Sequence, residues 1–228
     1  EFDPLPAKQQ FAHAQDAVNQ ACAHEDSKKT ELQRLGPRTG VMHRRHGTRG
    51  EKPGDDAWLQ ELAATMFRGT RDQAADAVAQ SLRDGYATEC IGEAMSLAAN
   101  MLALHDPGRL EKSANADKPA GSCHGDSVGV HASDAANAWR NIARVSNQRN
   151  AVASLIVGAY HTAGQAGGAN AQPYPLPEHL AEVKSTDAAA LLHEADEAIK
   201  ASDQFRAAAV MARYGQLGHD APTAFALM

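Results

Sequence analysis

Alanine dominates this sequence and limits what the chain can fold into. The 228 residues include 47 alanines; alanine with leucine accounts for 64 positions, whereas valine with isoleucine accounts for 14. Alanine and leucine favour helices, whereas β-sheets are built largely from β-branched and aromatic residues. The composition therefore predicts an all-α protein and argues against both a β-sandwich and a parallel α/β sheet.

The same composition predicts a core of closely packed small side chains. Leu, Ile, Val and Phe together amount to 36 residues, a fraction that is typical of disorder when the net charge is high. The formal net charge is only −6, so self-repulsion does not oppose collapse. We therefore expect helices whose backbones lie close together.

Charge, hydropathy and cysteine content narrow the classes of partner and location. A pI near 6.0 predicts that nucleic acid is not a partner. No run of eighteen apolar residues occurs, so we expect the chain not to span a membrane. Three widely spaced cysteines form no disulfide framework or CxxC motif, which favours a reducing, cytoplasmic location. Because the chain begins at Glu1 and not at methionine, we expect a trimmed product.

Glycine and proline divide the chain into segments. We predict an N-terminal helical segment over 1–35, a basic Gly/Pro loop over 36–54 and a main helical domain over 55–228, forming one domain overall. Capping residues, apolar spacing and terminal glycines predict the helices of the main domain, at 55–69, 70–85, 88–105, 130–145, 147–164, 186–201 and 203–216. The predicted fold is a single-domain antiparallel bundle or orthogonal array of about seven or eight helices. It has two long irregular loops, at 106–129 and 164–177.

The densest group of reactive side chains lies between residues 123 and 141. His131, Asp134, Asn137 and Asn141 recur at spacings of three and four, which places them on one face of a helix. The other faces carry mainly alanine and suit burial, so this polar face is expected to line an internal cavity. A solvated polar face is the alternative.

The next helix also carries polar residues in an apolar setting. Ser154 and His161 lie among Ala, Val, Leu and Ile, so both need partners inside the protein. If the two helices are antiparallel neighbours, His161 approaches His131 or the loop that carries His124 and Asp126. A buried histidine hydrogen-bonded to a backbone carbonyl is the alternative.

Histidines and carboxylates drawn from separate elements are typical of transition-metal sites. We predict a divalent transition metal (iron, zinc or manganese) bound by three histidines, His124, His131 and His161. The predicted catalytic residues around it are Asp126, Ser127, Asp134 and Arg140. Either Asp126 or Asp134 is expected to bind the metal directly or to hold a histidine ligand in position.

Two of these residues have alternative roles. Ser127 is also a candidate nucleophile, activated by a histidine and oriented by Asp126. Arg140 is expected either to bind an anionic substrate or to pair with an aspartate.

A second group of metal-ligand residues occurs near the C-terminus. His193 and Glu197 are four residues apart on one helical face, with Glu194 beside them, and helical Glu/His pairs of this kind occur in the metal sites of helical bundles. The surrounding pattern is also that of an ordinary amphipathic surface helix.

These features lead to two functional hypotheses. The first is a metal-dependent enzyme, an oxidoreductase acting on a small-molecule substrate, with its site between two buried helices and the 106–129 loop. The second is a non-catalytic helical subunit that packs through Ala-rich faces, as a homo-oligomer or in a larger assembly. The sequence contains no HExxH, GxSxG, GxGxxG or GxxxxGK[ST] motif, so zincin, hydrolase, Rossmann and P-loop functions lack their signature.

Overall fold

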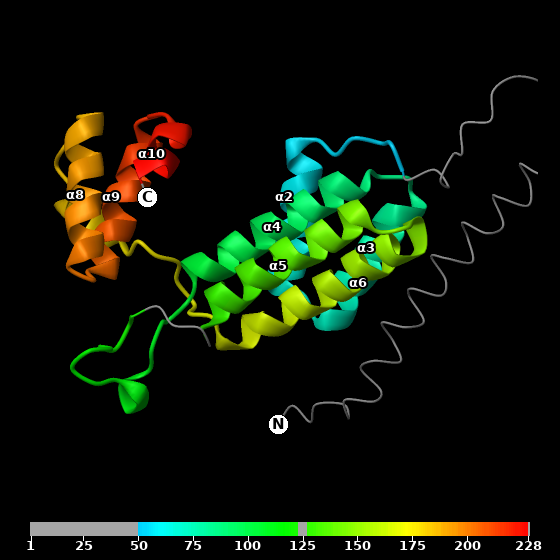
Figure 1. Cartoon of the computed structure of the whole chain (residues 1–228), viewed down its shortest axis with the longest axis horizontal. Helices are drawn as coiled ribbons and strands as arrows, with labels where there is room; N and C mark the ends of the chain where they lie inside the picture. Colours follow the sequence, from blue (N-terminus) through cyan, green and yellow to red (C-terminus); the bar gives the residue numbers. More distant parts are fainter. Residues whose placement is uncertain (1–49, 123–126, 228) are drawn as a thin grey trace, which may run out of the picture. The chain divides into compact units, whose positions relative to one another are not determined.

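The structure, a computed structural model, describes residues 50–122 and 127–227. The predicted N-terminal helical segment and most of the basic loop lie outside the described residues. In the described part, the regular elements are α-helices and short 3-10 helices, apart from one isolated bridge between Lys52 and Tyr86 (Figure 1). The predicted all-α fold is confirmed. None of the described helices combines the length and apolar character that crossing a bilayer requires.

The described helices fall into two compact units. Unit 1 is formed by the described residues up to Ala103 together with His131–Gly167. Unit 2 is formed by the described residues of Leu104–Val130 together with those from Gly168 onward. Each unit is therefore built from two stretches of chain. That the chain forms one domain overall, with 55–228 as its main helical part, stays a prediction.

Unit 1 contains the helices that the sequence predicted most clearly. They are α2 (Asp56–Arg68), α3 (Arg71–Arg83), α4 (Thr88–Leu104), most of α5 (Val128–Val145) and α6 (Gln148–Gln165). Each begins and ends within two residues of its predicted bounds. Side-chain caps explain this agreement: Asp55 accepts a hydrogen bond from the Trp58 amide at 2.8 Å, and Thr70 forms a capping box with Gln73. Such a cap stabilises a helix by about 1 kcal/mol.

Helix α6 is the most enclosed element of unit 1, as its apolar sequence predicted. It packs on α3 and α2, and its buried residues are Ala151, Val152, Ser154, Leu155, Ile156, Gly158, Ala159, Thr162 and Ala163. Its two buried hydroxyl groups are satisfied within the helix. Ser154 donates to the Asn150 carbonyl at 2.6 Å, and Thr162 donates to the Gly158 carbonyl at 2.9 Å.

Glycines in unit 1 allow three helices to approach closely. A methyl group added at Gly158 of α6 would lie 2.8 Å from the sulfur of Met95 on α4 and 2.9 Å from Cβ of Trp139 on α5. One added at Gly92 of α4 would lie 2.9 Å from Cγ of Arg140 on α5. The predicted close packing of small residues is therefore present at these helix crossings.

Unit 2 has its own small core. It contains α7 (Pro177–Glu182), α8 (Ala188–Lys200), α9 (Gln204–Gln216) and α10 (Ala221–Leu227). Helices α7 and α8 both pack on α9, and the buried cluster comprises Val183, Leu191, Ala195, Ala209, Val210, Tyr214 and Ala224. The sequence did not predict α7 and α10, which have six and seven residues.

The described residues of the predicted irregular loop after α4 are joined by local hydrogen bonds. It contains a 3-10 helix at Glu111–Ser113, and Arg109 exchanges backbone hydrogen bonds with Gly121 and Ser122. The buried carboxylate of Asp106 accepts the amides of Gly108 and Gly129, each at 2.8 Å. One carboxylate therefore fixes both the start of the loop and the first turn of α5.

The close approach at Gly158 predicts an asymmetry between two glycines. Gly158→Val should lower the free energy of unfolding by about 1–3 kcal/mol because the new side chain overlaps Met95 and Trp139. Gly215→Ala is the matched control, since the added methyl group on α9 meets nothing within 4 Å; it should raise stability by up to about 1 kcal/mol. Urea denaturation followed by circular dichroism measures both. Equal tolerance of the two substitutions would contradict the packing at Gly158.

Candidate functional site

The predicted polar face of α5 lies at the surface of unit 1. His131, Asp134, Asn137 and Asn141 are all exposed, and the Asn141 amide donates to the Asn137 side-chain oxygen at 3.1 Å. The face is thus the solvated one that the sequence left open as an alternative to a cavity lining. Its role in metal binding or catalysis stays a prediction.

Helices α5 and α6 lie side by side in unit 1 (Figure 1), and the charge of His131 acts on His161. Gly158 of α6 faces Cβ of Trp139 on α5. Two residues separate the end of α5 from the start of α6, and the chain reverses direction there. His161 is half-buried; its Nε2 lies 3.4 Å from Nε2 of Gln165, and its buried Nδ1 has no hydrogen-bond partner among the described residues.

The surroundings of His161 favour its neutral form. Burial is the main cause that lowers the pKa of His161, and the charges of Arg71 and His131 lower it further. A neutral imidazole can ligate a metal, but the Arg71 guanidinium opposes a cation at the same place. The other predicted histidine ligand, His124, and the predicted carboxylate Asp126 lie outside the described residues.

Ser127 and Arg140 have distinct surroundings. Ser127 is buried in unit 2, and its Oγ has no hydrogen-bond partner among the described residues, so its predicted role as a nucleophile stays a prediction. In unit 1, Arg140 donates to Oε1 of Glu89, at 2.5 Å from Nη2 and 3.1 Å from Nε, and to Oγ of Ser96 at 3.4 Å. The partner is a glutamate, where the sequence suggested an aspartate; this contact joins α5 to α4.

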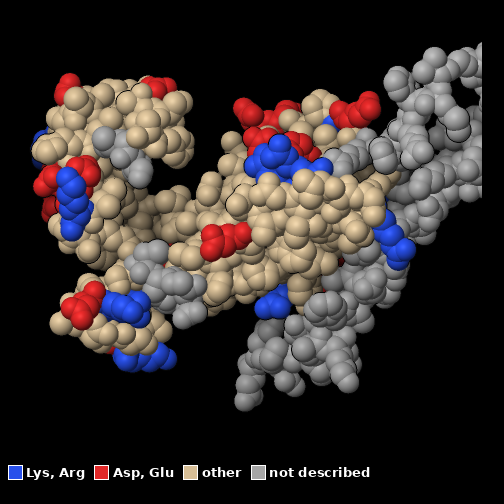
Figure 2. All heavy atoms as spheres, in the orientation of Figure 1, with Lys and Arg blue, Asp and Glu red and all other residues tan. Residues whose placement is uncertain are grey.

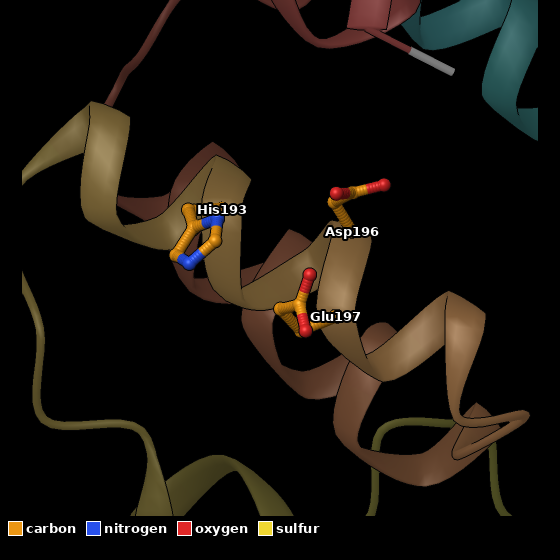
Figure 3. A group of neighbouring side chains, drawn as sticks. All are labelled: His193, Asp196 and Glu197. Atoms are coloured by element: carbon orange, nitrogen blue, oxygen red, sulfur yellow. The ribbon is translucent and has the colours of Figure 1, made fainter.

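A group suited to hold a metal occurs on α8 of unit 2. His193, Asp196 and Glu197 each offer one ligand atom, and these three atoms lie within 4.8 Å of one another. Figure 3 shows the three side chains projecting from the same stretch of the helix. Among the described residues, His193, Asp196 and Glu197 are the group of three or more His, Cys, Asp or Glu side chains whose ligand atoms lie this close together.

The fold of unit 2 explains why these three residues share the outer side of α8. Asp187 caps the helix by accepting the Ala190 amide at 2.8 Å. Leu191, Ala195 and Ala198 are buried against the core. His193 and Glu197 each lie two positions beyond a buried residue, about 200° around the helix, and are exposed; Asp196, one position beyond Ala195, is half-exposed.

The sequence identified two members of this group and missed the third. Glu194, which the sequence grouped with His193, forms an ion pair with Arg206 of α9 and is not part of the cluster. Asp196 takes its place. The signal for it was available, since Asp196 is three residues beyond His193 and one helical turn brings such positions together.

A lysine already contacts both carboxylates of the group. Lys200 Nζ lies 2.6 Å from Oδ2 of Asp196 and 3.2 Å from Oε1 of Glu197. The hydrogen bond to Asp196, and then the one to Glu197, raises the pKa of Lys200. On the face shown in Figure 2, acidic and basic side chains of the described residues lie together at some places and singly at others.

Comparison of the chain with protein-family models, with curated proteins and with solved structures found no match.

The lowered pKa of His161 predicts how stability depends on pH. Between the folded pKa and the ordinary value of 6.5, the unfolded chain binds more protons than the folded protein, so the free energy of unfolding falls as the pH falls through this window. His161→Gln should reduce that slope because glutamine does not titrate. Denaturation at pH values from about 5 to 8 measures it. Identical slopes in the two proteins would show that His161 is not held neutral by the fold.

Proposed function

We propose that this chain is a helical protein that binds a divalent transition metal ion through His193, Asp196 and Glu197. The observation that carries the proposal is the mutual distance of the three ligand atoms, within 4.8 Å. The core of unit 2 supports it by holding the inner side of α8, so that the outer side is presented at a fixed place.

The chemistry of the three side chains suits zinc, iron(II) or manganese. One imidazole nitrogen and two carboxylate oxygens are ligands that these ions accept. Ligand atoms lie about 2.0–2.2 Å from zinc, so two ligands of a tetrahedral ion are about 3.4 Å apart. Rotamer adjustments of exposed side chains bridge the difference from the distances observed here.

We assign the ion to α8 and not to the space between α5 and α6 because of the charges nearby. Two carboxylates attract a cation at His193, whereas the Arg71 guanidinium repels one at His161. Three protein ligands leave a coordination position for water or a substrate, which is the arrangement of catalytic zinc sites. The open coordination position supports the hypothesis of a metal-dependent enzyme. The further expectation that this enzyme is an oxidoreductase acting on a small molecule comes from the sequence alone.

A second candidate function is that of a homo-oligomeric helical subunit. It is favoured by large apolar side chains at the surface of unit 1: on α5, Val145 is 86% exposed and Ile142, one turn earlier, is 42% exposed. Contiguous exposed apolar surface is typical of association sites, and these two side chains, one helical turn apart, would form part of such a surface.

Calorimetric titration with Zn²⁺ tests the metal site. The wild type should bind one ion per chain, and His193→Ala should weaken binding by about tenfold or more, because a tenfold loss corresponds to only about 1.4 kcal/mol of lost ligation. His131→Ala is the matched control, an exposed histidine of unit 1, and should bind as the wild type does. Loss of binding in His131→Ala with retention in His193→Ala would overturn the assignment to α8.

Light scattering coupled to size-exclusion chromatography tests the second function. The wild type should elute at a multiple of 24.1 kDa, and the double variant Ile142→Ser, Val145→Ser should shift toward the monomer because it removes exposed apolar area from α5. A monomeric wild type would rule out self-association through this face.

A further inference from the structure

We propose that Lys200 is a built-in competitor for the metal site on α8, so that the ion and the lysine ammonium occupy the two carboxylates alternately. The inference rests on the proposed metal-binding function and concerns how that same site is regulated. It would make Lys200 the residue that sets the affinity of the site without being a ligand.

The geometry that supports this is the placement of the ammonium. Lys200 is four residues beyond Asp196 and three beyond Glu197, which puts all three side chains on one face of the last turns of α8. Its Nζ lies 2.6 Å and 3.2 Å from one oxygen of each carboxylate. The positive charge of Lys200 therefore already lies beside two of the three side chains that would bind an ion, the carboxylates of Asp196 and Glu197.

An ion and the ammonium cannot both stay close to these carboxylates. A divalent cation bound within about 2.2 Å of the carboxylate oxygens would lie a few ångströms from the ammonium, and like charges at such a distance repel. The lysine side chain is 63% exposed, so it has open solvent to move into. Exposed ion pairs are weak, and for this reason the competition lowers metal affinity without abolishing it.

Removing the charge of Lys200 should therefore tighten metal binding. From the repulsion between a single and a double charge in water, reduced by salt, we expect a gain of about threefold to tenfold. The gain should shrink as the salt concentration rises, because salt screens exposed charges. A purely structural role for Lys200 in ending the helix would give no such dependence on salt.

The test is calorimetric titration of the full chain with Zn²⁺ at low and high concentrations of sodium nitrate. Lys200→Met keeps the length and helix preference of the side chain and removes its charge. Lys118→Met is the matched control, since it removes one charge from an exposed lysine in the loop of unit 2. The expected result is tighter binding in Lys200→Met alone, with the advantage lost at high salt.

The outcomes separate the two proposals. Equal or weaker binding in Lys200→Met than in the wild type overturns the competition while leaving the metal site intact. Binding in both proteins, about threefold to tenfold tighter in Lys200→Met at low salt, supports both the metal site and the competition. Absence of binding in both proteins overturns the metal site and the competition with it.

Discussion

Close packing of helices through small side chains is the constraint on which the rest of the structure depends. With few large apolar residues, the chain gains burial by bringing backbones together, as at Gly158 and Gly92 in unit 1. In unit 2 the same principle holds α8 against α9, since Ala195 of α8 and Ala209 of α9 lie in one buried cluster. That inner contact leaves the outer face of α8 free to carry charged side chains at defined positions.

Local sequence signals were sufficient to predict where the long helices begin and end. They were insufficient for short helices and for elements whose place depends on residues distant in the sequence. Caps such as Asp55 and Thr70 lie next to the helices that they begin, so the bounds of α2 and α3 could be predicted. Helix α7 starts at Pro177 in a proline-rich stretch, and its place depends on contacts such as that between His179 and Phe205, whose rings lie 4.9 Å apart. Such contacts leave no periodic pattern in a segment of six residues.

The candidate site shows the same division between local and remote information. The pairing of α5 with α6 could be expected from their order in the chain, but which side of α5 faces solvent depends on what covers it. On α8, the sequence suggested Glu194 for the cluster with His193; the ion pair with Arg206 on another helix decided otherwise. Asp196 was identifiable by its spacing, and its carboxylate lies with that of Glu197 on the outer face.

The carboxylate of Asp106 has a consequence for how the chain can vary. This carboxylate accepts hydrogen bonds from the amides of both Gly108 and Gly129. The two ends of the loop between these glycines are therefore held together. A closed segment can change length at little cost, since doubling it adds only about 0.6 kcal/mol of closure entropy. Evolution or engineering can thus lengthen, shorten or replace this segment while the first turn of α5 keeps its anchor.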